Sequence, residues 1–402
     1  MSKESSVSAV MRVSMSSPDL SDLERQAVLS VLQTPRLSMG PKIEAFEAAI
    51  AGRVGARHAV AINSGTAGLH LCVRAVGLTD GDWALTTPFS FVSSSNVLLY
   101  ERVLPVFVDV EAHTGNLDPA LVEAAAGDLT QGGKAAGRWL PRRGVAPHGR
   151  LRGLLAVDVF GQPADYDRLL ITARRHAVPL IEDSCEALGA DYRGRPAGML
   201  GEIGVFAFYP NKQITSGEGG MIVTDRDEWA TMVRALRNQG RTPGDTWLDH
   251  TYLGYNYRMD ELDAALGQAQ MSRLDELMAK RDQVASWYAE GLAGISGVEA
   301  PNIAPTTTRS SWFVYVIRFD PAIARDDVIR RLEERGIPSR PYFKPIHLQP
   351  YFREMFGYGE GDFPVAEDLG RRSLALPFSG ILRREEVEIV CHELQSVLNE
   401  LP

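Results

Sequence analysis

The chain is poor in cysteine and has no long apolar run, and both features exclude classes of protein. Its 402 residues include three cysteines, Cys72, Cys185 and Cys391, which are far apart and form no CxxC motif. This spacing argues against a disulfide framework and against a structural zinc site, so we predict no bound metal. Nowhere do 18 apolar residues run together, and the N-terminus lacks the apolar core of a signal peptide. The sequence therefore predicts a cytoplasmic protein without membrane spans.

The chain also lacks an excess of positive charge. It has 42 basic and 51 acidic residues, a net charge of −9, which argues against a surface that attracts nucleic acid or anionic membrane as a whole. Apolar residues make up 45% and charged residues 23%, as in an ordinary globular protein. Because the length exceeds that of one common domain, we expect two or three domains.

Short apolar segments alternate with helical patterns through the first two-thirds of the chain. These segments are HAVAI (58–62), DWALTT (82–87), LPVFVDV (104–110), LRGLLAVDVFG (151–161), VPLIED (178–183), residues 204–208 and GMIVTD (220–225). Runs of this kind are typical of buried parallel strands, and the helical stretches at 67–76 and 166–176 suit right-handed crossovers. The sequence therefore predicts an α/β fold with a large, mostly parallel seven-stranded sheet.

The pattern changes after Arg258. One long helix is predicted from Asp260 to about Leu292, followed by a strand at SSWFVYVIRFD, a helix that ends at Gly336, and a final amphipathic helix at REEVEIVCHELQSVLNEL. We expect residues 1–257 to form an N-terminal arm and a large domain. Residues 258–402 would form a linking helix and a smaller C-terminal α+β domain.

Residues 127–153 form an unusual segment that is rich in glycine and basic residues. It carries Lys134, Arg138, Arg142, Arg143, Arg150 and Arg152 against a single acid, Asp128. We interpret it as an inserted loop or flap. Two roles are open for it: a basic rim for a phosphorylated substrate, or a solvated insertion without a role in binding.

The residues with the clearest chemical meaning lie between Ile181 and Asp225. Asp183 ends an apolar strand, and Lys212 follows the next strand and precedes the turn GEGG. Ligands of α/β proteins bind at the carboxyl edge of the sheet, and an acid, a lysine and nearby glycines there suit a site that forms an imine. A helix cap and a surface lysine are the alternative interpretation. In NSGTAGLHLCV (63–73) a helix start could bind an anion such as a phosphate.

The chain resembles a known family through these and further motifs. They are NSGTAGLHL, TTPFSFVSSSNVLLY, PVFVDV, VFGQPADYD, EDSCEALGADYRGRPAGMLGEIGVFAFYPNKQITSGEGG, LGYNYRMDELDAALGQAQ, PIHLQPY and ALPF. They are similar to those of the DegT/DnrJ/StrS sugar aminotransferases, which are pyridoxal 5'-phosphate (PLP) enzymes of fold type I, the aspartate aminotransferase-like fold. The resemblance covers nearly the whole chain. It implies PLP as cofactor, with pyridoxamine 5'-phosphate as its second form, and a homodimer with active sites at the interface.

The resemblance also assigns roles to residues around the cofactor ring. It implies that Lys212 bonds covalently to the cofactor and then carries the proton between the donor carbon and the cofactor carbon. Asp183 would pair with the ring nitrogen, and Phe91 would stack on the ring. Glu186 stands where many relatives have glutamine and would lie near the ring hydroxyl, so it either shares a proton with that oxygen or points elsewhere.

Other residues are implied at the phosphate and at the substrate. Thr66 and Ala67 would hold the cofactor phosphate through their backbone amides, and Ala207 replaces a serine that is common at that place. Asn256 would reach the site from the partner subunit. The substrate candidates lie in RPYFKPIHLQPYF: they are Arg340, Tyr342, Lys344 and, as the preferred one, His347.

The function implied is the transfer of an amino group from glutamate or glutamine to a keto sugar linked to a nucleoside diphosphate. A cyclitol ketone or an aminobenzoate precursor as substrate remains an alternative. Sugar dehydration is disfavoured because the dehydrating relatives carry histidine in place of Lys212. A regulator without catalytic activity is disfavoured because Asp183 and Lys212 are both present.

Overall fold

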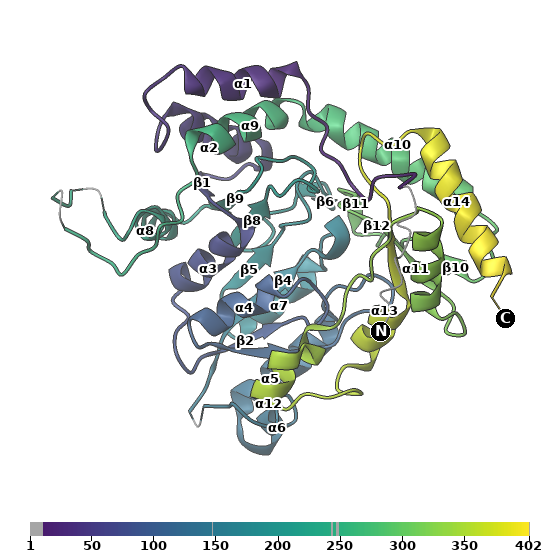
Figure 1. Ribbon diagram of the computed structural model, residues 1–402. Helices are drawn as coiled ribbons and strands as arrows, with labels where there is room; N and C mark the ends of the chain where they lie inside the picture. Colours follow the sequence, from purple (N-terminus) through teal and green to yellow (C-terminus); the bar gives the residue numbers. More distant parts are fainter. Residues whose placement is uncertain (1–10, 147, 243, 247–248, 402) are drawn as a thin grey trace, which may run out of the picture.

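A computed structural model describes residues 11–401 except 147, 243, 247 and 248 (Figure 1). The first ten residues of the expected N-terminal arm lie outside the described residues. The chain folds around a seven-stranded sheet with the strand order β1-β9-β8-β5-β4-β2-β3. Its strands are β1 (His58–Ile62), β2 (Trp83–Thr86), β3 (Leu104–Phe107), β4 (Leu151–Val157), β5 (Leu180–Asp183), β8 (Ile203–Ala207) and β9 (Gly220–Thr224).

The pairing of the strands confirms the predicted fold class. β3, β2, β4, β5 and β8 run parallel, and β9 is antiparallel to both of its neighbours, β1 and β8. Each of the seven apolar segments found in the sequence supplies one strand of this sheet. The parallel strands end at the same edge: Asp183 at the end of β5 pairs with Val205, and β8 ends two residues later at Ala207.

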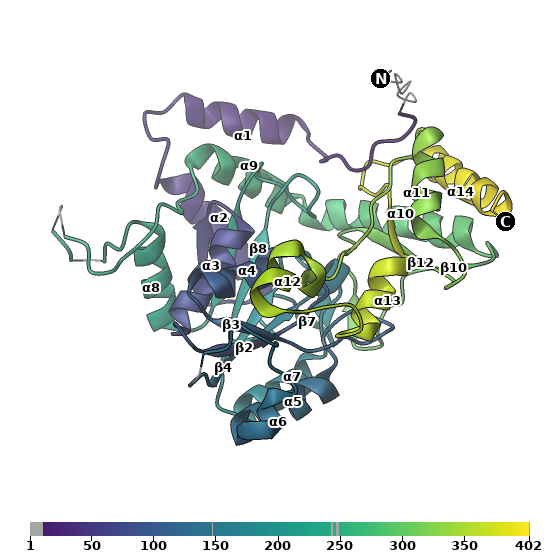
Figure 2. The ribbon, with the colours of Figure 1, turned by 60° about the horizontal axis from the view of Figure 1, so that its bottom comes forward.

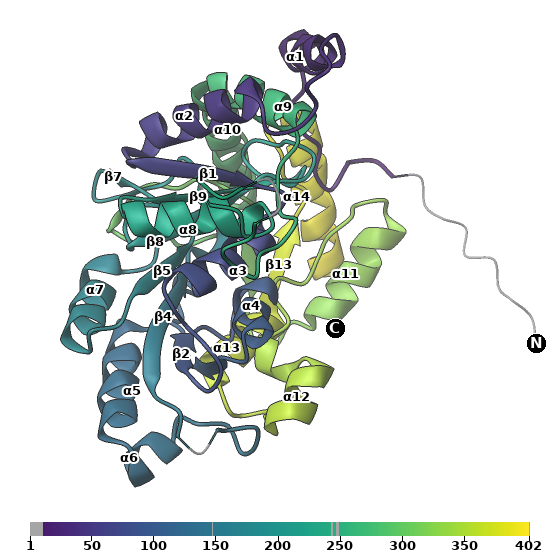
Figure 3. The same cartoon turned by 90° about the vertical axis from the view of Figure 1, so that its left-hand side faces the viewer.

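Helices cover both faces of the sheet. On one face lie α3 (Gly65–Ala75), α4 (Ser93–Tyr100) and α8 (Asp227–Arg237), and on the other lie α5 (Pro119–Gln131) and α7 (Tyr166–Arg175), as Figure 3 shows around β4. Successive side chains of a strand point to opposite faces. Accordingly, Leu155 and Val157 of β4 pack with the first group, whereas Leu154 and Ala156 pack with the second.

Two further helices extend the core at the β1 side of the sheet. α2 (Pro41–Val54) packs its apolar side chains against β1, β8 and β9, and α1 (Asp22–Leu32) packs on α9 (Glu261–Ser272). Residues of β8, including the fully buried Phe206, join this cluster. The strand that precedes Lys212 is therefore held by packing on both of its faces.

The C-terminal part forms a second sheet, as predicted for a smaller α+β unit. The strands β10 (Val298–Glu299), β12 (Tyr315–Phe319) and β13 (Ser373–Leu376) are antiparallel, and α11 (Arg325–Glu334), α13 (Pro364–Arg372) and α14 (Arg384–Asn399) lie beside them to one side of the large sheet (Figure 2). A third small sheet joins β6 (Asp191–Tyr192) and β7 (Arg195–Pro196) to β11 (Thr307–Arg309). The second sheet has its own apolar core, into which Val13 near the N-terminus also packs.

The predicted single helix from Asp260 to Leu292 is in fact two helices. α9 ends at Ser272, and α10 (Leu274–Leu292) begins after Arg273, whose backbone leaves helical geometry. The guanidinium of Arg273 binds Asp19 at 3.0 Å and Glu24 at 2.8 Å. These ion pairs join the helix break to residues far away in the sequence, so local periodicity gave no sign of the break.

Residues 127–153 were expected to be a loop, and much of this segment is regular structure instead. α5 continues to Gln131, the short helix α6 (Gly133–Gly137) follows, and β4 begins at Leu151; residue 147 lies outside the described part. Arg138 donates from Nε to Asp128 at 2.6 Å, and Arg142 binds Asp362 through two bonds of 2.6 Å. Both arginines also line a cavity of about 430 Å³. Their pairing with carboxylates weakens the interpretation of this segment as an open basic rim.

A helix that crosses a bilayer needs about 20 consecutive, mostly apolar residues. Within the described ranges, the chain contains no helix that is both long and apolar enough to cross a membrane.

Candidate active site

Asp183 lies at the carboxyl end of β5, near the middle of the large sheet. Its side chain is buried, and the N–H of Cys185 donates to its Oδ1 at 3.2 Å. Burial raises the pKa of Asp183, while the hydrogen bond from Cys185 and the charge of Lys212 act in the opposite direction. A buried carboxylate is stabilised by a nearby positive charge. The position of Asp183 therefore suits a ligand with a cationic group.

Lys212 follows β8 in a turn closed by the hydrogen bond from its N–H to the carbonyl of Tyr209, 2.9 Å long. The side chain is 12% exposed, and its Nζ lies 3.8 Å from Oε1 of Glu186. The same Nζ lies 3.8 Å from the centre of the Phe313 ring, a distance at which an ammonium interacts favourably with an aromatic face. The amine is therefore held between a carboxylate and an aromatic ring.

Glu186 completes this group. Burial raises its pKa to about 7, although Lys212 and the backbone of Phe160 act to lower it. The N–H of Phe160 donates to Oε2 of Glu186 at 2.9 Å. The backbone carbonyl of Glu186 accepts bonds from Gln213 at 2.6 Å and from Ser311 at 2.8 Å. The structure thus brings the predicted residues Asp183, Glu186 and Lys212 together at one edge of the sheet.

The start of α3 lies against the same edge. Ser64 caps the helix: its Oγ accepts from the N–H of Ala67 at 3.1 Å, and its carbonyl accepts from Gly68 at 3.0 Å. The Ala67 amide, predicted to hold a phosphate, is thus paired with the cap in this structure, and Thr66 lies half-buried on the same first turn. A Cβ at Gly65 would lie 2.7 Å from Cβ of Ala207. The helix start therefore approaches the end of β8 as closely as a glycine permits.

These residues fit pyridoxal phosphate as a ligand. Lys212 offers an amine that can bond to an aldehyde, Asp183 a buried carboxylate for a ring cation, and the first turn of α3 a site for an anion. The Oδ1 atoms of Asn63 and Asn211, next to α3 and to Lys212, are buried without a hydrogen-bond partner. Polar atoms that need partners are therefore present beside both the expected phosphate and the expected aldehyde.

Phe91, expected to stack on the cofactor ring, lies just before α4 with 62% of its surface exposed, whereas Phe89 of the same motif is buried. Its ring is thus accessible to a ligand or to a second chain. Asn256 is also exposed, and its carbonyl accepts from the side chain of Asn63 at 3.5 Å. The flanking Tyr255 and Tyr257 stack at 4.9 Å. The roles of Phe91 and Asn256 stay predictions.

The four substrate candidates lie in different surroundings. Tyr342 faces the site: burial raises its pKa to about 12, and the charge of Glu186 adds to that rise. Arg340 and Lys344 are exposed. His347 is fully buried, with Nε2 3.1 Å from Oε1 of Glu367. Contact of any of the four with substrate stays a prediction.

Three residues that the sequence did not single out also shape the site: Phe160, Arg281 and Phe313. Phe160 and Phe313 each stand in an apolar stretch of the sequence. In such a stretch an aromatic residue is expected to belong to the core. Arg281 is a fully buried arginine of α10 that donates to the carbonyl of Lys212 at 2.6 Å. Its helical position gave no local sign of this contact.

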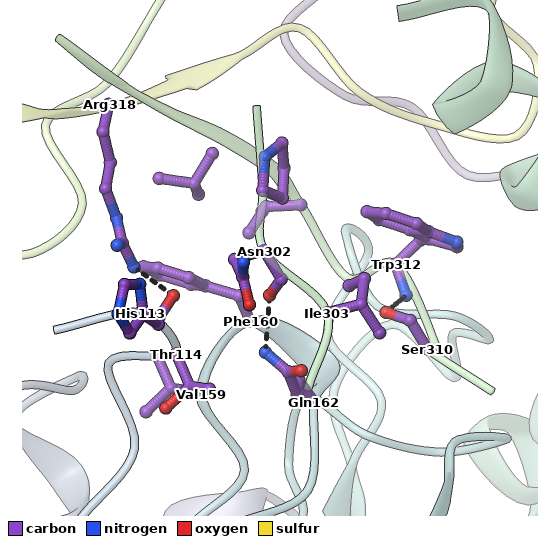
Figure 4. Close-up of a pocket in the computed structure, with 13 residues that line it drawn as sticks. His113, Thr114, Val159, Phe160, Gln162, Asn302, Ile303, Ser310, Trp312 and Arg318 are labelled. Atoms are coloured by element: carbon purple, nitrogen blue, oxygen red, sulfur yellow. Dashed lines mark hydrogen bonds between the residues drawn. The ribbon is translucent and has the colours of Figure 1, made fainter. Parts of the chain in front are cut away.

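A cleft next to the site separates segments of the large sheet from the C-terminal segment (Figure 4). It is lined by Phe160, Gln162 and His113 on one side and by Asn302, Trp312 and Arg318 on the other. The side chain of Gln162 crosses between the two and donates to the carbonyl of Asn302 at 3.1 Å. Phe160 is common to this cleft and to the surroundings of Glu186, so the cleft lies beside the group formed by Asp183, Glu186 and Lys212.

Comparison with known proteins points to one family. The profile of the DegT/DnrJ/EryC1/StrS aminotransferase family matches residues 18–395. GDP-perosamine synthase of Caulobacter vibrioides is 36% identical, and the match covers 98% of this chain and all of that protein. The dTDP-3-amino-3,4,6-trideoxy-alpha-D-glucose transaminase of Streptomyces venezuelae is 33% identical over 90% of this chain and 88% of that protein.

A solved structure agrees with these sequence matches. The crystal structure of DesV from S. venezuelae superposes with a TM-score of 0.83 at 32% identity, covering 94% of this chain and 95% of that one. The family profile reaches from before α1 to within α14, so the sites described above all lie inside the matched region.

Proposed function

Since the chain belongs to the DegT/DnrJ/EryC1/StrS aminotransferase family, we propose that it aminates a keto sugar linked to a nucleoside diphosphate, with glutamate or glutamine as amino donor. The family consists of PLP-dependent aminotransferases. The observation that carries the proposal is the meeting of the Lys212 amine, the Glu186 carboxylate and the buried Asp183 at one edge of the sheet. Both relatives described above bear the names of enzymes that make nucleotide-linked amino sugars.

Each residue has a defined task in this reaction. When bound, PLP supplies an aldehyde carbon and a ring that withdraws electrons from a carbanion. Lys212 would hold the cofactor through its neutral Nζ, and the same atom would carry the proton to and from the reacting carbon. Asp183 would pair with the ring nitrogen and favour its protonated form.

Other parts of the chain bind and orient. The first turn of α3, with Thr66 and Ala67, would hold the phosphate group, and Phe91 would cover one face of the ring. Asn256 from a second copy of the chain would close the site, so the active form is a homodimer. Segments of both proposed domains, residues 1–257 and 258–402, line the cleft of Figure 4. Tyr342 and His347 are the preferred contacts for that substrate.

The test is a substrate panel. Nucleotide-linked 4-keto and 3-keto sugars and cyclitol ketones are incubated with the protein, PLP and glutamate or glutamine, and formation of the 2-oxo acid is followed. We expect turnover of a nucleotide-linked keto sugar and none with Lys212→Ala. Turnover of cyclitol ketones alone would show that the substrate is a cyclitol ketone and not a keto sugar. Absence of turnover with every ketone would contradict the proposal.

A further inference from the structure

Glu186 and Lys212 form an enclosed pair whose geometry is fixed from several sides. The two side chains are 11% and 12% exposed. Oε2 of Glu186 is held by the N–H of Phe160 at 2.9 Å, which leaves Oε1 facing Nζ of Lys212 at 3.8 Å. This distance suits an ion pair and is longer than a hydrogen bond.

The other ionisable groups around the pair come from several segments. The negative charge of Asp183 in β5 acts to raise the pKa of Glu186. The negative charge of Glu186 in turn acts to raise the pKa of the Cys185 thiol and of the Tyr342 phenol. Arg340 supplies positive charge near Tyr342. In this setting burial keeps the pKa of Glu186 at about 7, against the effect of Lys212. The carboxyl group therefore gains and loses its proton near neutral pH.

A lysine amine must lose its proton before the nitrogen can attack a carbonyl carbon. If the proton passes from Nζ to Oε1, one N–H bond breaks and one O–H bond forms. An ammonium and a carboxylate become an amine and a carboxylic acid, and the net charge of the pair stays zero. Release of the proton to water would instead leave a buried carboxylate without its partner, which costs more free energy.

We propose that Glu186 is the proton partner of Lys212: it takes the proton that Lys212 gives up when its amine becomes a nucleophile, and returns it when the amine is released. Glu186 thus acts on the reaction through Lys212 and is a positioning residue. Its use in catalysis rests on the proposed function. The proton exchange itself is a property of the chain without cofactor or substrate and can be measured there.

The first experiment measures the ionisation of Lys212 in the chain without cofactor. Brief acetylation with acetic anhydride between pH 5 and 11, followed by peptide mass spectrometry, gives the pH at which Lys212 becomes reactive. In Glu186→Gln the buried ammonium has lost its counter-charge, so we expect this midpoint to fall by about one pH unit or more, which is a tenfold larger neutral fraction. Glu334→Gln, a change on the exposed face of α11, is the matched control and should leave the midpoint unchanged.

The second experiment separates proton exchange from simple charge attraction. The rate at which the chain takes up PLP is followed by absorbance as a function of pH. In the wild type the rate should rise through about pH 7 as Glu186 ionises and becomes able to accept the proton. This step should be missing in Glu186→Gln and should reappear in Glu186→Asp, which restores a carboxylate.

Two results would overturn the inference: an unchanged Lys212 midpoint in a folded Glu186→Gln, or a step near pH 7 that persists in that variant. Folding is checked by circular dichroism, and Glu186→Asp provides a second variant that retains an acid. Both measurements are independent of keto-sugar turnover. If the Lys212 midpoint shifts in Glu186→Gln but the protein aminates no ketone, the proton exchange between Glu186 and Lys212 is supported and only the proposed function is rejected.

Discussion

Arg281 donates a hydrogen bond of 2.6 Å from its Nη2 to the backbone carbonyl of Lys212. The same guanidinium donates to the carbonyls of Asn211 at 3.3 Å, Trp312 at 3.0 Å and Phe313 at 3.3 Å. Burial lowers its pKa to about 10, so it remains charged at neutral pH. One side chain of α10 therefore fixes the turn that carries the amine to the segment that carries the Phe313 ring.

Replacement of Arg281 should loosen this connection. In Arg281→Gln several buried carbonyls lose their donors, and we expect the free energy of unfolding to fall by about 3 kcal/mol. Arg281→Lys keeps the charge but offers fewer donors in a different geometry. Its free energy of unfolding should therefore lie between those of the wild type and Arg281→Gln. Urea denaturation of the three proteins measures the effect. Equal stability of Arg281→Gln and the wild type would show that these bonds do not hold the site.

Gly65 should be intolerant of even the smallest side chain. In Gly65→Ala the new Cβ would lie 2.7 Å from Cβ of Ala207 and 2.9 Å from Sγ of Cys185, so the start of α3 has to shift. We expect PLP to bind about tenfold more weakly because its phosphate site moves, with a loss of stability of about 1–3 kcal/mol. Titration with PLP measures the affinity. The double variant with Ala207→Gly removes one of the two contacts and should recover part of the affinity for PLP. Wild-type affinity in Gly65→Ala would argue against a phosphate at this helix start.

Asp183→Asn tests the carboxylate beneath the expected ring nitrogen. The change preserves size and removes the charge, so the ring nitrogen loses the group that keeps it protonated. We expect turnover to fall by about 100-fold or more, while the covalent bond to Lys212 still forms. Stopped-flow measurement of the half-reaction with glutamate gives the rate. Asp326→Asn, on the exposed side of α11, serves as the control; a loss smaller than threefold in Asp183→Asn would reject its assigned role.

Glu186 should make stability depend on pH. Its pKa is about 7 in the folded chain and near 4.5 in the unfolded chain, so between these values the folded state binds more protons and stability falls as pH rises. Glutamine has no such dependence. The stability advantage of unliganded Glu186→Gln over the wild type should therefore grow from pH 4.5 to pH 7 by roughly 3 kcal/mol and then level off.

Urea denaturation at pH 5, 6, 7 and 8 provides this measurement. Groups that titrate equally in both proteins cancel in the difference. An advantage that is the same at every pH would mean that the carboxyl group of Glu186 is not kept protonated by its surroundings.

The fold was largely predictable because its signals are local. Each strand of the large sheet is a short apolar run, and α3 and α7 lie within about two residues of their expected positions. Asp183 and Lys212 were predictable as neighbours because the ends of parallel strands meet at one edge. The break at Arg273 was missed because ion pairs with Asp19 and Glu24, about 250 residues away, stabilise it.

The surroundings of the Lys212 amine were not predictable because they come from segments far away in the sequence. Phe313 and Arg281 reach Lys212 from segments about 100 and 69 residues away, and nothing in their local sequence marks this contact. The buried His347 and the exposed Phe91 show the other limit: a motif identifies a residue, but its burial depends on how distant segments pack and on the second chain that we propose. For Glu186 the sequence left two possibilities open, and the structure turns one of its oxygens toward Lys212.

The proposed function requires the amine of Lys212 to form the covalent bond to PLP. Reduction of the protein with borohydride in the presence of PLP, followed by mass spectrometry of its peptides, locates this bond. We expect one phosphopyridoxyl group per chain, on Lys212, and none at that position in Lys212→Ala. Modification of a different lysine, or a protein that gains no phosphopyridoxyl group at all, would contradict the proposed function.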